Sequence, residues 1–265
     1  MIYKDIDNKE ALFAVLERMY RLAGPDKKAM IARELRTMRA GIRNEREAAW
    51  LLDSWLKDAT RTAVVHDLRL DLGPGRVAQI DHVLVHRTRR FFVLDTKGFA
   101  QGVRLLDDGR YLRWNDEHKR FDALPSPLLQ GERNAAVLRQ ALAQIGVADA
   151  VVESLALVAP AARIERARRA DTAALMKADA FLDKLNGLTD GPATTLAPLG
   201  GLLRTGLHDS IGDIAKKLVA LHRPSPGDAM ARFGLGADTL PAPAAAAPDA
   251  VAAPEETAPA AQAPV

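Results

Sequence analysis

The chain has 265 residues, 48% of them hydrophobic, and a formal net charge of +3. This length and hydrophobic fraction predict a soluble globular protein of one or two domains. Cysteine is absent, which excludes disulfide bonds and cysteine-based zinc sites, and the six histidines show no spacing typical of metal ligands. The sequence starts with charged residues and contains no apolar run of about 18 residues, so we expect no membrane interaction and a cytoplasmic location.

The first part of the chain predicts helices. Residues 11–43 are periodic and highly charged, and a Gly-Pro step predicts a pair of helices broken at Pro25. Residues 44–57 carry a stronger apolar stripe, for which Asn44 is the expected N-cap. Glu45 then shares a face with apolar residues and can point inward, although a first-turn acid stabilised by the helix dipole is the simpler interpretation.

A predicted strand at residues 63–70 is followed by two short apolar runs, residues 77–86 and 91–97. The turn between these two runs is polar, so they are expected to form an antiparallel hairpin centred on Thr88. In such a pair the numbers of directly opposed residues have a constant sum. Three oppositions follow: Asp81 with Asp95, Gln79 with Lys97, and Val83 with Val93.

Opposed Cβ atoms lie about 4.5 to 5.5 Å apart on one face of a sheet, so Asp81 and Asp95 would repel each other. A hard divalent cation, most plausibly Mg²⁺ with Mn²⁺ as a substitute, would resolve this conflict, because it binds one or two carboxylates together with water and phosphate oxygens. Lys97 could then hold a phosphate oxygen or orient an attacking water, which outlines a phosphodiester-hydrolysis site. The alternative is that both acids face solvent and Lys97 forms a surface ion pair worth roughly 0 to 1 kcal/mol.

The later elements complete a mixed pattern. They are strands at 103–106 and 111–114, a helix at 128–145, a buried strand at 151–158, and helices at 173–185 and 210–222. This order predicts an α/β or α+β sandwich. Residues 236–265 are rich in Ala and Pro with four acidic residues and no Lys or Arg, which predicts disorder. The rest of the chain then has a formal charge of +7, four more than the total of +3, which suits a polyanionic partner.

Five short motifs occur in a fixed order along the chain. They are Asn44 to Ala49, Gln79-Ile-Asp-His82, Asp95-Thr-Lys97, Leu112 to Asn115, and Ser126 to Gln130. In this order they resemble the nuclease-related domain family, a branch of the restriction-endonuclease-like PD-(D/E)XK superfamily. The resemblance implies an α/β fold with a restriction-endonuclease-like core, whose mixed central sheet is flanked by helices.

The resemblance also implies a division of the chain. Residues 43–158 would form the nuclease-like domain, preceded by a helical segment at 1–42. A helical extension at 159–235 and the disordered tail at 236–265 would follow it.

Residue by residue, the resemblance implies four catalytic positions: Glu45, Asp81, Asp95 and Lys97. Glu45, Asp81 and Asp95 would bind the metal, and Gln79 and Gln130 would position a DNA substrate. Two residues depart from the family pattern, since Asn44 stands where Gly is usual and Asp95 where Glu is usual. These departures keep open a non-catalytic module that binds nucleic acid or docks a partner. A scaffold whose Ala/Pro tail recruits another protein is a third reading.

Overall fold

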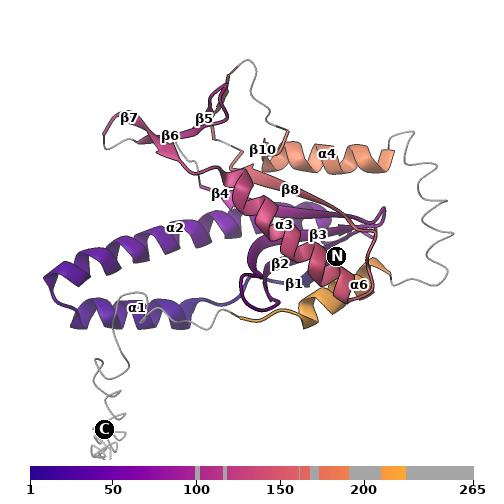
Figure 1. Ribbon diagram of the computed structural model, residues 1–265, viewed down its shortest axis with the longest axis horizontal. Helices are drawn as coiled ribbons and strands as arrows, with labels where there is room; N and C mark the ends of the chain where they lie inside the picture. Colours follow the sequence, from indigo (N-terminus) through magenta and orange to yellow (C-terminus); the bar gives the residue numbers. More distant parts are fainter. Residues whose placement is uncertain (99–101, 116–117, 161, 168–172, 191–209, 225–265) are drawn as a thin grey trace, which may run out of the picture.

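The structure is a computed structural model that describes residues 1–98, 102–115, 118–160, 162–167, 173–190 and 210–224 (Figure 1). The predicted disordered tail at 236–265 lies outside the described residues. Within the described part of the chain, no helix is both long and apolar enough to cross a membrane.

A six-stranded mixed sheet forms the centre of the protein. Its strand order is β1 (Ile2–Lys4), β2 (Thr62–Asp71), β3 (Val77–His86), β4 (Arg90–Lys97), β8 (Val151–Val158) and β10 (Leu175–Lys177). The β2–β3 and β3–β4 pairs are antiparallel, whereas β1–β2, β4–β8 and β8–β10 are parallel. Antiparallel pairs are joined by short turns, but β4 returns to the parallel strand β8 through helix α3 (Pro127–Gln144), as parallel pairing requires.

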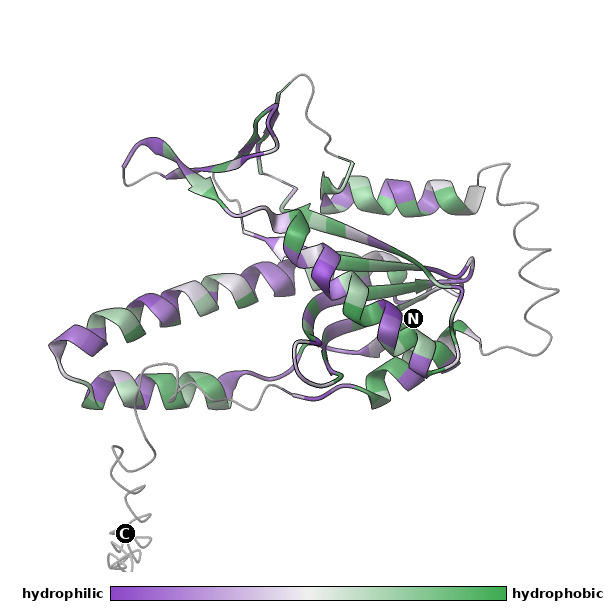
Figure 2. Ribbon diagram, viewed as in Figure 1, coloured by the Kyte–Doolittle hydropathy of each residue, from purple (hydrophilic) through white to green (hydrophobic). Residues whose placement is uncertain are grey.

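Helices pack on both faces of this sheet. Successive side chains of a strand point to opposite faces, so each central strand contributes to two cores. On one face Phe91 and Val93 of β4 pack in a core with α3 and with α6 (Ile211–Ala220). On the other face Phe92 and Leu94 pack in a second core with the end of α2 (Pro25–Leu56) and with α4 (Ala178–Asp190). Figure 2 shows these central strands as largely hydrophobic. The predicted α/β fold, a mixed sheet flanked by helices, is confirmed.

Two further units extend from the centre (Figure 1). A four-stranded sheet has the order β7 (Arg120–Leu124), β6 (Tyr111–Asn115), β5 (Val103–Leu105) and β9 (Ile164–Arg166). The helix α1 (Glu10–Leu22) packs on the first half of α2 through a small core of Leu16, Met19, Ile31 and Leu35. The break predicted at Pro25 is confirmed, since Pro25 begins α2.

Two predicted boundaries are wrong. Asn44 is not an N-cap, because α2 runs without interruption from Pro25 to Leu56. The apolar stripe of residues 44–57 continues one that begins at Ile31, and no proline interrupts it. The helix predicted from residue 173 begins only at Ala178, because Leu175–Lys177 pairs with β8 as strand β10. A three-residue edge strand is specified by its neighbour in the sheet rather than by its own sequence.

Candidate active site

The β3–β4 hairpin places Asp81 and Asp95 where the ladder between these two strands ends. The predicted register is confirmed, since Val83 pairs with Val93 and His82 with Leu94. The ladder ends there, so neither Asp81 and Asp95 nor Gln79 and Lys97 are ladder partners. Beyond that point the backbone N–H of Thr96 donates a hydrogen bond to Oδ2 of Asp81 across 2.6 Å. The acids therefore meet where the two strands separate.

The carboxyl group of Asp81 lies close to two other acids. Its pKa is raised to about 8, most strongly by burial and then by the negative charges of Asp95 and Glu45. The hydrogen bond from Thr96 and the positive charge of Lys97 act in the opposite direction without cancelling it. Three acids from α2, β3 and β4 thus act on one another electrostatically.

Lys97 contacts both Asp95 and α3. Its ammonium nitrogen lies 2.5 Å from Oδ2 of Asp95 and donates to Oε1 of Gln130 across 3.1 Å. The Asp95 side chain is only 5% exposed, and its Oδ2 has this ammonium as a charge partner but no well-directed hydrogen bond. Burial raises the pKa of Asp95 although Lys97 opposes the shift. The structure therefore brings Asp95, Lys97 and Gln130 together.

Gln79 has a different neighbour from the predicted one. Its side-chain amide donates to Oδ1 of Asp67, whereas its backbone carbonyl accepts from the side chain of Asn134 across 2.8 Å. The ladder between β2 and β3 pairs the residues on either side of Asp67 with those on either side of Asp81, so Asp67 lies across from Asp81. Asp67 is buried, and its φ of 49° is unusual for a residue other than glycine.

Lys9 connects Asp67 to Glu45. Its ammonium nitrogen lies 3.2 Å from a carboxylate oxygen of each. Burial, the largest single influence, lowers the pKa of Lys9, but the charges of Glu45 and Asp67 together outweigh it and raise the pKa. Sequence reasoning missed both Lys9 and Asp67. An acid inside the apolar run of β2 was a signal for Asp67, whereas nothing in the sequence marks Lys9.

A chain of buried and partly buried hydrogen bonds approaches the acids from the α2 side. Asp53 Oδ1 lies 2.9 Å from Nε2 of His66, and the Nδ1 atoms of His66 and His82 lie 2.8 Å apart. Nε2 of His82 lies 3.1 Å from the hydroxyl of Thr96. One set of protons satisfies every contact with both imidazoles neutral, because Thr96 can donate to His82, His82 to His66, and His66 to Asp53. The chain thus ends at the residue whose N–H holds Asp81.

The end of β4 is pressed against α2. A Cβ atom on Gly98 would lie 1.9 Å from Nδ2 of Asn44, so only glycine allows this approach without displacing the amide. Asn44 is the residue where the family usually has Gly, and here its side chain contacts the residue that follows Lys97. This packing brings Glu45, one residue further along α2, to the acidic end of the hairpin.

The family model of the nuclease-related domain matches residues 40–159. By this match, residues 40–159 are similar to the nuclease-related domain family, as the sequence motifs predicted. The matched segment includes Glu45, Asp81, Asp95 and Lys97, as well as the helix that carries Gln130. No curated protein and no solved structure matches the chain.

The nuclease-related domain contains a pair of acids suited to a hard cation. Asp81 and Asp95 meet the preference of Mg²⁺ for one or two carboxylates, with water and phosphate oxygens filling its other positions. Their burial and raised pKa values are the conflict that such a cation would relieve. Within the described part of the chain, no group of three or more His, Cys, Asp or Glu side chains is placed to hold a metal ion. Glu45, paired with Lys9, is therefore not placed as a third direct ligand.

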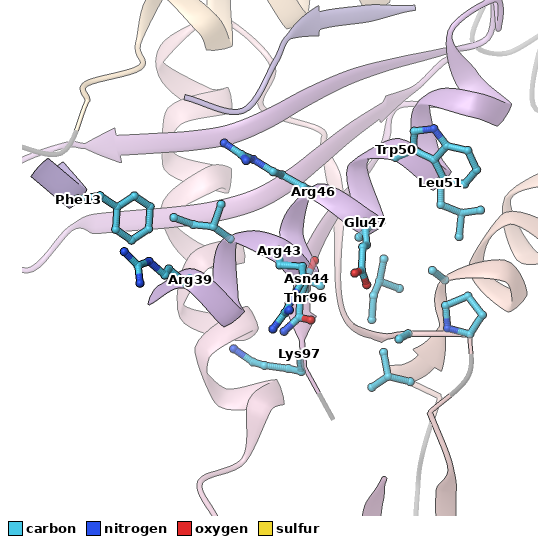
Figure 3. A pocket seen from close by; sticks show the side chains of 17 residues that line it. Phe13, Arg39, Arg43, Asn44, Arg46, Glu47, Trp50, Leu51, Thr96 and Lys97 are labelled. Atoms are coloured by element: carbon cyan, nitrogen blue, oxygen red, sulfur yellow. The ribbon is translucent and has the colours of Figure 1, made fainter. Parts of the chain in front are cut away.

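A groove of about 600 Å³ opens beside Lys97, between α2 and the ends of β4 and β8. Figure 3 shows side chains of α2 along it, from Arg39 to Trp50, with Thr96 and Lys97 of β4 at its lower side. Because Lys97 lines the groove and also pairs with Asp95, a molecule lying in the groove would contact a residue of the acidic site.

Proposed function

We propose that this protein is a metal-dependent nuclease that hydrolyses phosphodiester bonds in DNA. Asp81 and Asp95 would bind a Mg²⁺ or Mn²⁺ ion, and Glu45 would hold one of its water molecules. Gln79 and Gln130 would position the substrate beside the acids. The family match supports a nuclease-related function, and the arrangement of the acids supports the hydrolytic form of it.

The observation that carries this proposal is the meeting of Asp81, Asp95 and Glu45 at a partly buried strand end. Like charges that are partly buried close together lower the stability of the fold. Such groups are typical of functional sites. Acids that faced solvent would raise one another's pKa values far less, because water screens their repulsion. A site that binds a cation accounts for the arrangement directly.

The roles of the side chains follow from the chemistry of hydrolysis, in which water attacks phosphorus and an alkoxide oxygen leaves. A bound divalent cation would supply Lewis-acid stabilisation of the developing charge and lower the pKa of a bound water. Lys97 would donate to a non-bridging phosphate oxygen, in the position where it now donates to Gln130. Gln130 would accept from the attacking water or from Lys97. The proton of that water would pass to bulk solvent, because Asp81 and Asp95 would hold the cation as carboxylates.

The ion pairs of two lysines with the acids favour a second function, which is binding of nucleic acid without cleavage. Lys97 pairs with Asp95 and Lys9 with Glu45, so two of the three acids already have a cationic partner. A nuclease-like fold stabilised in this way by its own lysines could bind nucleic acid without cleaving it. This non-catalytic module is the alternative that the same experiment decides.

The test is cleavage of labelled DNA by the purified protein with Mg²⁺, with Mn²⁺ and with a chelator. We expect metal-dependent product, which Asp81→Asn should abolish. Asp108→Asn is the matched control, because Asp108 is an exposed acid on the turn between β5 and β6. Binding of DNA without any cleavage by the wild-type protein would favour the non-catalytic module.

A further inference from the structure

The groove beside Lys97 is lined by two kinds of side chain. Its charged lining consists of Arg39, Arg43, Arg46, Lys97 and the single acid Glu47. Four positive groups and one negative group give this surface a formal charge of +3. Its apolar lining includes Ile42, Ala48, Leu51, Leu157, Val158 and Pro160. A ligand that fits must therefore combine negative charge with apolar surface.

Arg43 and Arg46 are free to meet a ligand. Both are exposed, and within the described residues neither has an ion-pair partner. Arg39 by contrast lies 2.5 Å from Glu17 of α1, so part of its charge is already neutralised. The unpaired positive charge in this part of the groove thus belongs to Arg43 and Arg46, which outnumber the exposed Glu47, and Lys97 lies at its end.

Trp50 adds a flat aromatic surface to the same groove. Its side chain lines the groove and is 71% exposed. A large apolar side chain that is this exposed contributes little to the stability of the fold. Trp55 is similarly exposed, at 64%, and belongs to the same helix, but it does not line the groove. From Arg39 to Trp50 the helix rises about 16 Å, which is enough for a few nucleotides.

We propose that this groove binds single-stranded DNA and leads it to the acids. Arg43 and Arg46 neutralise phosphates, Trp50 stacks on a base, and the backbone reaches Asp81 and Asp95 past Lys97. Single strands combine an anionic backbone with accessible base faces, and proteins bind them with basic grooves and exposed aromatic side chains. A duplex hides its base faces, so it would leave Trp50 and the apolar lining without a partner. The inference rests on the proposed function, whose substrate form it names.

The first experiment measures binding alone, in chelator, by the fluorescence anisotropy of labelled oligothymidine of about 16 nucleotides, the upper end of typical site sizes. We expect it to bind more tightly than a duplex of equal length. Trp50→Ala should weaken binding of the single strand about 5- to 100-fold, as loss of one stacking contact does. Trp55→Ala is the control and should leave affinity unchanged. Both tryptophans are exposed, so thermal melts should show that both variants fold.

The second experiment measures the dependence of the same affinity on salt. Replacing Arg43 and Arg46 together by Ala should reduce the slope of log affinity against log salt by roughly 1.4, since each phosphate contact on a single strand contributes about 0.7. Replacing Arg33 and Arg36 together by Ala is the matched control, because both are exposed on α2 but do not line the groove. An equal effect of this control would show that only the overall charge matters, which would overturn the assignment to this groove.

The outcomes separate this inference from the proposed function. Trp50-dependent binding of oligothymidine by a protein that cleaves nothing would sustain the groove and reject the nuclease. Metal-dependent cleavage with equal affinity for single and double strands, insensitive to Trp50→Ala, would reject the groove and sustain the nuclease. Capture of an acidic peptide by the groove, with no binding of oligothymidine, would also overturn the inference.

Discussion

The ammonium nitrogen of Lys97 lies 2.5 Å from Oδ2 of the buried Asp95. The lysine therefore occupies a position beside Asp95 in which a metal cation would neutralise the carboxylate. Its second partner, Gln130 on α3, lies 3.1 Å away and offers it an alternative position. A metal ion bound between Asp81 and Asp95 would compete with Lys97 for Asp95 and release the ammonium toward Gln130 and a phosphate.

Lys97→Ala should lower the rate of DNA cleavage about 100- to 1,000-fold, because preorganised charges act mainly on the transition state. DNA affinity should change far less, since the variant loses one phosphate contact among several. The measurements are the cleavage rate and the affinity at several salt concentrations. Lys216→Ala, an exposed change on α6, is the control. Equal cleavage by Lys97→Ala and wild type would remove Lys97 from the mechanism.

Asp81→Asn should stabilise the metal-free protein above pH 4. The pKa of Asp81 is raised to about 8, so the folded state keeps a proton that the unfolded chain has lost, and stability falls as the pH rises from about 4 to about 8. Asn carries no charge and keeps an oxygen for the N–H of Thr96. We expect a gain of about 1 kcal/mol or more at pH 8 and none near pH 4. Denaturant melts with chelator measure it, and a loss of stability at pH 8 would show that the Asp81 carboxylate is structural.

The His66–His82 pair should make the protein sensitive to acid. Burial, followed by the charge of His66, lowers the pKa of His82 well below its usual value. Below about pH 6.5, His82 is therefore protonated in the unfolded chain but not in the folded state. The free energy of unfolding then falls as the pH falls. His82→Leu should flatten this acid limb and cost about 1 to 3 kcal/mol at neutral pH, because Thr96 and His66 lose a partner. An unchanged acid limb in the variant would contradict the assignment to His82.

Lys9→Met should destabilise the protein by about 1 to 3 kcal/mol, because the buried Asp67 and the partly buried Glu45 lose their shared cation. Adding Asp67→Asn should recover part of the loss, since it removes one of the two unpaired charges. Urea melts of the single and double variants form the required cycle. If the changes in unfolding free energy caused by Lys9→Met and Asp67→Asn are additive, the two residues are not energetically coupled and their contact does not stabilise the fold.

The hairpin was predictable from sequence because a short polar turn fixes the sum of opposed residue numbers over the whole ladder. The acids at its end followed from that register. The inward position of Glu45 was also expected, but it arises from the packing of Asn44 on Gly98 within a long helix, not from a helix start. The contacts of Lys9 with Asp67 and of His66 with His82 depend on how distant segments meet. No local pattern specifies such contacts.

In the proposed nuclease, Asp95 would be a carboxylate ligand of the catalytic metal. The most direct measurement is the Mg²⁺-dependent rate of DNA cleavage by wild type, Asp95→Asn and Asp95→Glu, each with its fold confirmed by thermal melting. Asp95→Asn should be inactive because it loses the charge, whereas Asp95→Glu should cleave because it restores the acid usual in the family. Cleavage by Asp95→Asn at the wild-type rate, or cleavage by wild type in chelator, would contradict the account.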